Sequence, residues 1–232
     1  MAQWLIVGDP HGNYAPLRDA LATGPEPDAV ILLGDMDLER PLEIELRDCD
    51  LDPLRTPVFW IPGNHDAEAE AYHDNLFHSA LADRNLHGKV VEIDGLRVAG
   101  LGGVFRGKVW NGIDAPRHAS RSAFLRQVVK SQRWREGIPL RHVATIWPED
   151  VDALTAACAN APADILITHE APSFFPTGHA GIDRAARLSG ARAVLHGHHH
   201  AAYRGCALDG TRVHGFAEAE ARWIDPTRDL FA

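Results

Sequence analysis

Three short apolar runs in the first third of the chain each end at a glycine that is followed by a polar residue. They read WLIVGD at residues 4–9, AVILLGD at 29–35 and PVFWIPGN at 57–64. Short apolar runs separated by longer amphipathic stretches are typical of buried strands in an alternating α/β protein. Open α/β sheets bind their ligands in the crevice beyond the carboxyl ends of the strands. The pattern therefore predicts an α/β fold with a functional site at these strand ends.

The rest of the chain continues this alternation, without a fixed-period repeat. Hairpins are expected at 89–103 and 206–216, because Asp94-Gly95 and Asp209-Gly210 are typical hairpin turns. Asp66 is placed to cap the N-terminus of a helix over 67–83. The remaining expected elements are helices at 14–23, 40–49, 148–159 and 181–189 and strands at 164–169 and 193–196. These elements predict two α/β halves whose strand ends face a common cleft.

Length and composition limit the class of protein. A chain of 232 residues with 45% hydrophobic content can bury a large core, and we expect one domain over residues 1–232. The N-terminal apolar run is too short for a signal peptide or a membrane span, so we expect a soluble, cytoplasmic protein. Cys49, Cys158 and Cys206 form no CxxC pair, which argues against a disulfide framework or a thiolate zinc site. Nothing in the sequence indicates an oligomeric state.

The charge distribution is uneven. A net charge of −9 argues against a general nucleic-acid binder, so nucleic acid is left open as a partner but is not favoured. Between Gly103 and Thr145, however, nine basic residues stand against two acidic ones. This basic insert, 106–142, is either a solvated surface or a cap that selects anionic substrates. Trp110 and Trp134 within it either stack on a base or aryl group or seat the insert on the core.

The residues beyond the strand ends share one chemistry. They offer carboxylate, imidazole and amide groups without thiolate, which suits Mn, Fe or Zn. They are Asp9, His11, Asp35, Asn64, His65, His169, His198 and His200. Each alone is ordinary turn or core chemistry, but the set is large enough for two cations, which can share a carboxylate at about 3.5–4 Å separation. Two such ions favour phosphoryl transfer to water.

In chain order these residues form D-x-H, G-D, G-N-H-D, a lone H and G-H-x-H. The sequence thereby resembles the calcineurin-like binuclear metallophosphoesterases over residues 9–200. The resemblance implies a four-layer α/β/β/α sandwich and two divalent metal ions, of which manganese is expected to support activity in vitro. It implies that one metal is held by Asp9, His11 and His200, the other by Asn64, His169 and His198, with Asp35 bridging the two.

The same resemblance gives His65 a role in catalysis rather than in metal binding. A histidine beside the metals can give a proton or a hydrogen bond to the leaving oxygen. Asp37 and Asp66 are both candidates for orienting its ring, although an N-cap role also explains Asp66. The serine/threonine protein phosphatase branch has Asp three residues after the bridging Asp and Arg four residues after it. Here Asp37 follows Asp35 by two residues and Arg40 by five, so that branch is not supported.

The expected activity is metal-dependent hydrolysis of a phosphate ester by a metal-bridging hydroxide. A phosphomonoesterase acting on a small metabolite, a nucleotide or a phosphoprotein is favoured, and its phosphate dianion would need guanidinium partners. Arg40, Arg106 and Arg117 are the candidates. A phosphodiesterase or nuclease of the same chemistry is the alternative. A binding or scaffold protein that has lost catalysis is disfavoured, because every expected ligand and His65 are present.

The stretch LHGHHHAAY at 195–203 contains four imidazoles in five positions. If this segment is extended, His198 and His200 face the metals while His199 turns away. His196 is expected to be structural or to support the ligands from behind. Gly197 is expected to let the backbone turn toward the metals.

Overall fold

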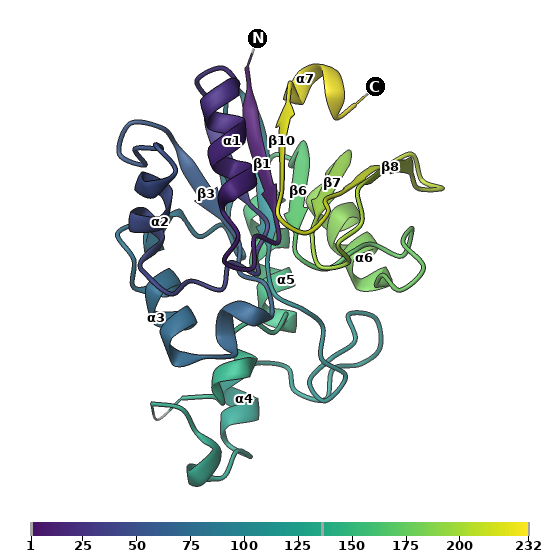
Figure 1. The fold of residues 1–232 in the computed structure, drawn as a ribbon. Coiled ribbons are helices and arrows are strands. Elements are labelled where there is room, and N and C mark those ends of the chain that lie inside the picture. The colour runs from purple at the N-terminus through teal and green to yellow at the C-terminus, as the bar shows by residue number, and fades with distance from the viewer. Residues whose placement is uncertain (1, 136, 232) are drawn as a thin grey trace.

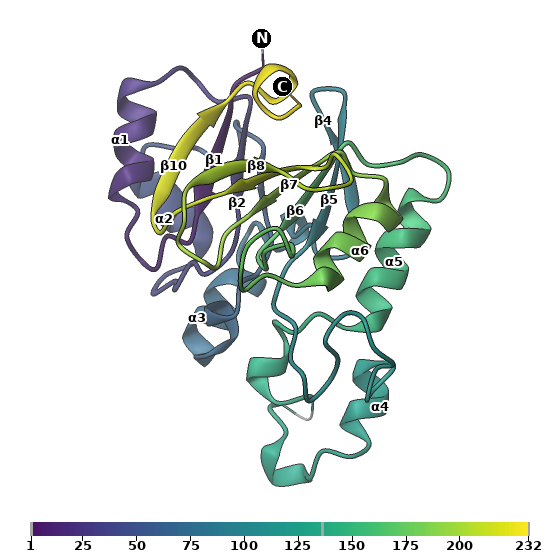
Figure 2. The same ribbon diagram turned by 90° about the vertical axis from the view of Figure 1, so that its right-hand side faces the viewer.

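The computed structural model describes residues 2–135 and 137–231 and contains two stacked β-sheets, which Figure 2 shows side by side. The first sheet is mainly parallel, with an antiparallel edge strand contributed by the C-terminal part of the chain. Its strands, in spatial order, are β10 (Glu220–Ile224), β1 (Trp4–Gly8), β2 (Ala29–Leu32) and β3 (Val58–Trp60).

The second sheet has a parallel centre flanked by two antiparallel edges. In spatial order its strands are β4 (Val90–Ile93), β5 (Leu96–Leu101), β6 (Ile165–Thr168), β7 (Ala193–His196), β9 (Arg212–Gly215) and β8 (Tyr203–Cys206). Both expected hairpins are confirmed, since β4 pairs with β5 and β8 pairs with β9.

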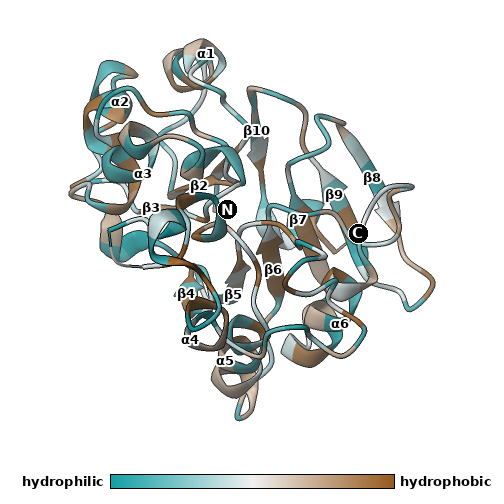
Figure 3. Ribbon diagram, turned by 90° about the horizontal axis from the view of Figure 1, so that it is seen from below, coloured by the Kyte–Doolittle hydropathy of each residue, from teal (hydrophilic) through white to brown (hydrophobic). Residues whose placement is uncertain are grey.

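The helices lie on the outer faces of the two sheets, as the view from below in Figure 3 shows. Those beside the first sheet are α1 (Ala15–Thr23), α2 (Leu42–Asp48) and α3 (Glu70–Phe77). Those beside the second sheet are α5 (Pro148–Cys158) and α6 (Ala180–Ser189). The short helices are α4 (Arg121–Leu125), α7 (Pro226–Asp229) and the 3₁₀ turns η1 (His65–Ala67), η2 (Ala82–Arg84), η3 (Lys130–Gln132) and η4 (Leu140–His142).

Alternation along the strands divides the buried apolar side chains into three cores. In β1, Trp4 and Ile6 pack between the sheets, whereas Leu5 and Val7 pack under the helices of the first sheet. In β6, Ile165 and Ile167 face the space between the sheets, and Leu166 faces α5 and α6. Because successive strand side chains point to opposite faces, each sheet separates two cores. The layers are therefore helix, sheet, sheet and helix, and the predicted four-layer α/β/β/α architecture is confirmed.

Two parts of the chain depart from the expected elements. The helix expected over 67–83 is broken into η1, α3 and η2, and α3 begins directly after Ala69, without a side-chain cap. The strand β10 and the helix α7 were not anticipated. The sequence of β10, EARWI, is short, and the strand is held by pairing with β1, from which it is distant in sequence.

In the basic insert 106–142, the described residues form α4, η3, η4 and connecting loops, and they lie beyond the carboxyl ends of the strands, with α4 at the bottom of Figure 1. Trp110 is buried in the core beneath α5 and α6, and Trp134 packs edge-on against His73 of α3 at 4.5 Å between ring centroids. Both tryptophans thus seat the insert on the body of the protein. No helix in the described ranges has the length and apolar character needed to cross a bilayer.

Candidate metal centre

The segments beyond the carboxyl ends of β1, β2, β3, β6 and β7 deliver the predicted ligands to one place. Asp9 follows β1, Asp35 lies beyond β2 and His169 follows β6 directly. The Asp35 carboxylate lies 3.2 Å from His169 Nε2, and the Asp9 carboxylate lies 3.5 Å from His169 Nδ1. All three side chains are almost completely buried. Two carboxylates therefore meet around one imidazole at the junction of the two sheets.

The other predicted ligands adjoin this trio. Asn64 Oδ1 lies 3.3 Å from His169 Nε2, and His11 Nε2 lies 3.8 Å from Asp35 Oδ2. His11 Nε2 and His200 Nε2 are 3.2 Å apart, a distance at which two nitrogens can point at a common ion. The backbone N–H of His198 donates to Asp9 Oδ2 at 2.7 Å. The structure thus brings together all seven residues that the sequence offered as ligands.

Strained backbone accompanies the site. Six of its residues have φ between 37° and 68°, in the left-handed region that residues other than glycine rarely adopt: Asp9, His11, Asp35, Asp37, His198 and His200. Such conformations cost on the order of 1–3 kcal/mol each and persist where the surrounding structure holds them. The expectation of an extended segment through residues 197–200 is therefore wrong, because this segment is a loop with left-handed residues at His198 and His200.

Asp66 holds the loops of the site rather than a helix end. Its carboxylate is buried and accepts hydrogen bonds from the backbone N–H groups of Asp35, Met36 and Gly63 at 2.7–3.0 Å. Burial, together with the negative charge of Asp35, raises the pKa of Asp66 to about 7. The predicted N-cap role is wrong, and Asp66 faces the backbone instead of the ring of His65. It joins the loops after β2 and β3.

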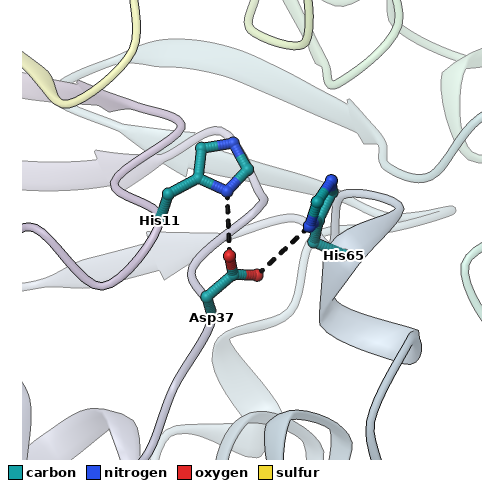
Figure 4. A group of neighbouring side chains, drawn as sticks. All are labelled: His11, Asp37 and His65. Carbon is teal, nitrogen blue, oxygen red and sulfur yellow. Dashed lines mark hydrogen bonds and ion pairs between the residues drawn. The ribbon is translucent and has the colours of Figure 1, made fainter.

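Asp37 is the carboxylate that faces His65. Figure 4 shows it between two rings: Oδ2 lies 2.9 Å from His11 Nδ1, and Oδ1 lies 3.7 Å from His65 Nδ1. Of the two candidate orienting groups, the geometry favours Asp37. Glu68, which the sequence did not single out, lies 3.6 Å from the same His65 nitrogen. The His65 side chain is 39% exposed, so it borders solvent.

The donor set fits divalent cations. Burial raises the pKa of Asp9 to about 6 and would also lower that of His169, but Asp35 and Asp9 raise the pKa of His169 to about 10. The buried carboxylates therefore favour a positive charge at their centre. Asp9 Oδ1 has no hydrogen-bond donor among the described residues. A Cβ at Gly63 would collide with Asp35 Oδ1, and one at Gly197 would collide with Asp9 Oδ1. Both glycines leave room for the carboxylates.

The four histidines of 196–200 differ in their surroundings. His196 is buried, and its Nδ1 and Nε2 face the Gly197 carbonyl and the Tyr203 hydroxyl, which agrees with the structural role expected for it. His199 stacks on Phe175 with ring centroids 4.5 Å apart. Because a Cβ at Gly197 would meet Asp9, the glycine is needed for close approach, and its own φ is not in the left-handed region.

The three candidate phosphate-binding arginines occupy different settings. Arg40 is half-exposed and forms ion pairs with Glu45 and Asp48 of α2 at 2.8–2.9 Å. Arg117 is exposed. Arg106 is partly buried just beyond β5, and burial, with the charge of Arg141, lowers its pKa. Its Nε is buried without an acceptor among the described residues. Arg106 is the guanidinium of the three that combines partial burial with a nitrogen lacking an acceptor among the described residues.

Comparison with known proteins agrees with this site. The sequence profile of the calcineurin-like phosphoesterases matches residues 3–202. The chain belongs to this family, and it is accordingly a metal-dependent phosphoester hydrolase that requires divalent metal ions.

Its relatives include an uncharacterized protein of Haemophilus influenzae that is 38% identical over 198 residues, covering 84% of this chain and 82% of the relative. Among solved structures, the protein TT1561 of Thermus thermophilus superposes with a TM-score of 0.60 at 16% identity, covering 96% of this chain and 98% of that one. A dimetal phosphatase from Danio rerio superposes with a TM-score of 0.53 at 12% identity, covering 94% and 88%. These two likenesses are likenesses of fold.

Proposed function

We propose that this protein is a phosphomonoesterase that uses two divalent cations and acts on a small phosphate ester. The observation that carries the proposal is the convergence of seven ligand side chains from both sheets beside His65, whose ring faces Asp37. One cation would be held by Asp9, His11 and His200, the other by Asn64, His169 and His198, with Asp35 between them. Manganese is the ion we expect to support activity in vitro. The pairing of β1 with β10 supports treating residues 1–232 as one unit.

When bound, the cations would lower the pKa of water and neutralise charge on the phosphoryl oxygens. Residues of the chain itself would act on the leaving oxygen. Asp37 and Glu68 lie near Nδ1 of His65, which leaves Nε2 as the nitrogen available to the leaving oxygen. Since this ring borders solvent, His65 can receive a proton from water between turnovers. General acid catalysis of this kind contributes roughly 10²–10⁴-fold.

Arg106 is the residue we assign to the phosphate. A guanidinium matches the geometry of phosphate oxygens, and its interaction strengthens when it is partly removed from water. Arg106 is near Glu68 and Glu170, residues that adjoin His65 and His198 respectively. Arg40 remains a candidate only if its ion pairs with α2 open.

The monoesterase is favoured over a nuclease because of the two tryptophans in the insert. A strand-binding groove would present aromatic rings for stacking on bases. Trp110 is 5% exposed, and Trp134 is packed against His73 and Arg135. Neither ring is free to serve as an open platform.

The test is a side-by-side assay of an aryl phosphate monoester and the matching diester, with Mn²⁺, Zn²⁺ or Fe²⁺ added to metal-depleted protein. We expect turnover of the monoester, highest with Mn²⁺. Turnover of the diester alone would contradict the proposal. Elemental analysis of the manganese-loaded protein checks the scaffold alternative, which would be supported by fewer than one metal per chain together with inactivity.

A further inference from the structure

Glu170 is a buried carboxylate that none of the roles above employs. It follows His169 directly, and its residue is 3% exposed. Backbone N–H groups of Phe105 and Ala171 face its carboxylate. A carboxylate removed from water is costly unless its charge is met by donors or by positive groups. The groups around Glu170 should therefore include partners that stabilise its buried charge.

Three imidazoles converge on this carboxylate. The Nε2 atoms of His198 and His199 each lie 3.7 Å from Glu170 Oε1, and Nε2 of His179 lies 3.9 Å from Oε2. These distances are longer than hydrogen bonds but within close electrostatic contact. His198 and His199 come from the loop after β7, whereas His179 precedes α6. Glu170 thus joins the end of β6 to two other segments.

We infer that Glu170 is a positioning residue that orients His198 toward its metal. The inference rests on the proposed two-metal centre. Since Nε2 of His198 faces Glu170, Nδ1 is the nitrogen left for the cation that Asn64 and His169 also hold. Histidine ligands usually donate their second ring N–H to a carboxylate or carbonyl, which selects the tautomer and the ring orientation.

The packing around His199 supports this assignment. Its ring is stacked on Phe175, and its Nδ1 lies 3.3 Å from the Thr177 hydroxyl, so two further contacts hold the His199 ring beside the same carboxylate oxygen that His198 faces. With His199 and His179 in place, Glu170 has little freedom to swing away from His198. The third position of G-H-H-H thereby gains a structural role, because His199 keeps the carboxylate behind its neighbour.

The first test is metal titration of the Glu170→Gln variant. Loss of an outer carboxylate typically weakens metal affinity about 10–100-fold. We expect calorimetric titration of metal-free protein with Mn²⁺ to show one of the two sites weakened by about that factor and the other unchanged. Asp150→Asn is the matched control, because Asp150 is also buried and lies 3.2 Å from a histidine, His87, that is not a predicted ligand. It should lower thermal stability and leave both affinities as in the wild type.

The second test is independent of the variant's folding. In Zn²⁺-loaded wild-type protein with ¹⁵N-labelled histidine, we expect the His198 ring to carry metal at Nδ1 and a proton at Nε2. Metal at Nε2 would overturn the inference, as would a folded Glu170→Gln variant that binds two ions as tightly as the wild type. A wild-type protein that binds no metal would instead overturn the proposed function, and the inference with it.

Discussion

In the proposed two-metal centre, one carboxylate lies behind a predicted ligand of each ion, and these two carboxylates differ in their exposure. Asp37, behind His11, has a side chain that is 17% exposed. Glu170, behind His198, has a side chain that is 4% exposed. Asp37 also faces His65, which borders solvent, whereas the other two imidazoles near Glu170 belong to histidines outside the predicted ligand set.

This difference separates two roles. A carboxylate at the solvent-facing side can hold a ligand and also orient the group that meets the leaving oxygen. A carboxylate buried under three rings can only hold its ligand. We therefore expect loss of Asp37 to change metal binding and proton transfer together, and loss of Glu170 to change metal binding alone.

The largest effect is expected at Asp35, which lies between the two halves. Asp35→Asn weakens the carboxylate that we assign to both ions, so both should be lost together and activity should fall to background. Elemental analysis and the monoester assay measure the two effects. Asp19→Asn, on the exposed surface of α1, is the control and should leave both unchanged. If the Asp35→Asn variant retained two ions, Asp35 would not be the ligand that the two ions share.

His65→Ala should spare both metals and lower turnover by roughly 10²–10⁴-fold on esters with poor leaving groups. The loss should be much smaller with p-nitrophenyl phosphate, because its leaving group needs little protonation. The ratio of kcat values for an alkyl and an aryl monoester reports this directly. If the His65→Ala variant turned over the alkyl ester as fast as the wild type, His65 would have no role in the mechanism.

Asp37→Asn should weaken the binding of one ion by about 10–100-fold, since it removes the carboxylate behind His11. At saturating metal it should still lower turnover of alkyl esters, because the ring of His65 loses its partner. In the double variant Asp37→Asn/His65→Ala, that second effect should disappear. If saturating metal restores full turnover to Asp37→Asn, then Asp37 serves His11 alone.

The smallest effect is expected at His199. His199→Ala removes a ring stacked on Phe175, a contact worth about 0.5–1.5 kcal/mol, and we expect a modest loss of thermal stability with both ions retained. His198→Ala is the matched comparison and should lose one ion. Equal metal loss in the two variants would show that His199 is itself a ligand.

The strands and the residues of the candidate site could be predicted from local patterns in the sequence. The apolar runs before Asp9, Asp35 and His169 are short and strongly hydrophobic, so the strand ends could be located and the neighbouring polar residues gathered. Parallel strands in adjacent positions bring those ends to one edge. The order of the motifs along the chain then indicated the family.

Long-range contacts could not be predicted in the same way. Asp66 stands before a short helix, a local context that favours a cap, yet it bonds the backbone of a loop about thirty residues earlier. Glu170 could have been noticed as a charged residue just beyond the buried strand β6, but its three imidazole neighbours depend on how β7 and α6 pack. The left-handed backbone at His198 and His200 likewise could not be located from the local sequence, because histidine adopts it more often than most residues but still only in a minority of cases.

The antiparallel strand β10 has a consequence for where this protein can be shortened. The family match ends at residue 202, and every predicted ligand precedes that point. Yet β10 covers the outer edge of β1, and the backbone N–H of Ala219 donates to the carbonyl of Asp9 at 2.9 Å. A chain ending at residue 202 would keep its whole ligand set and still leave β1 as a bare sheet edge, open to pairing with other chains. Residues outside the predicted ligand set thus protect the strand that leads to Asp9.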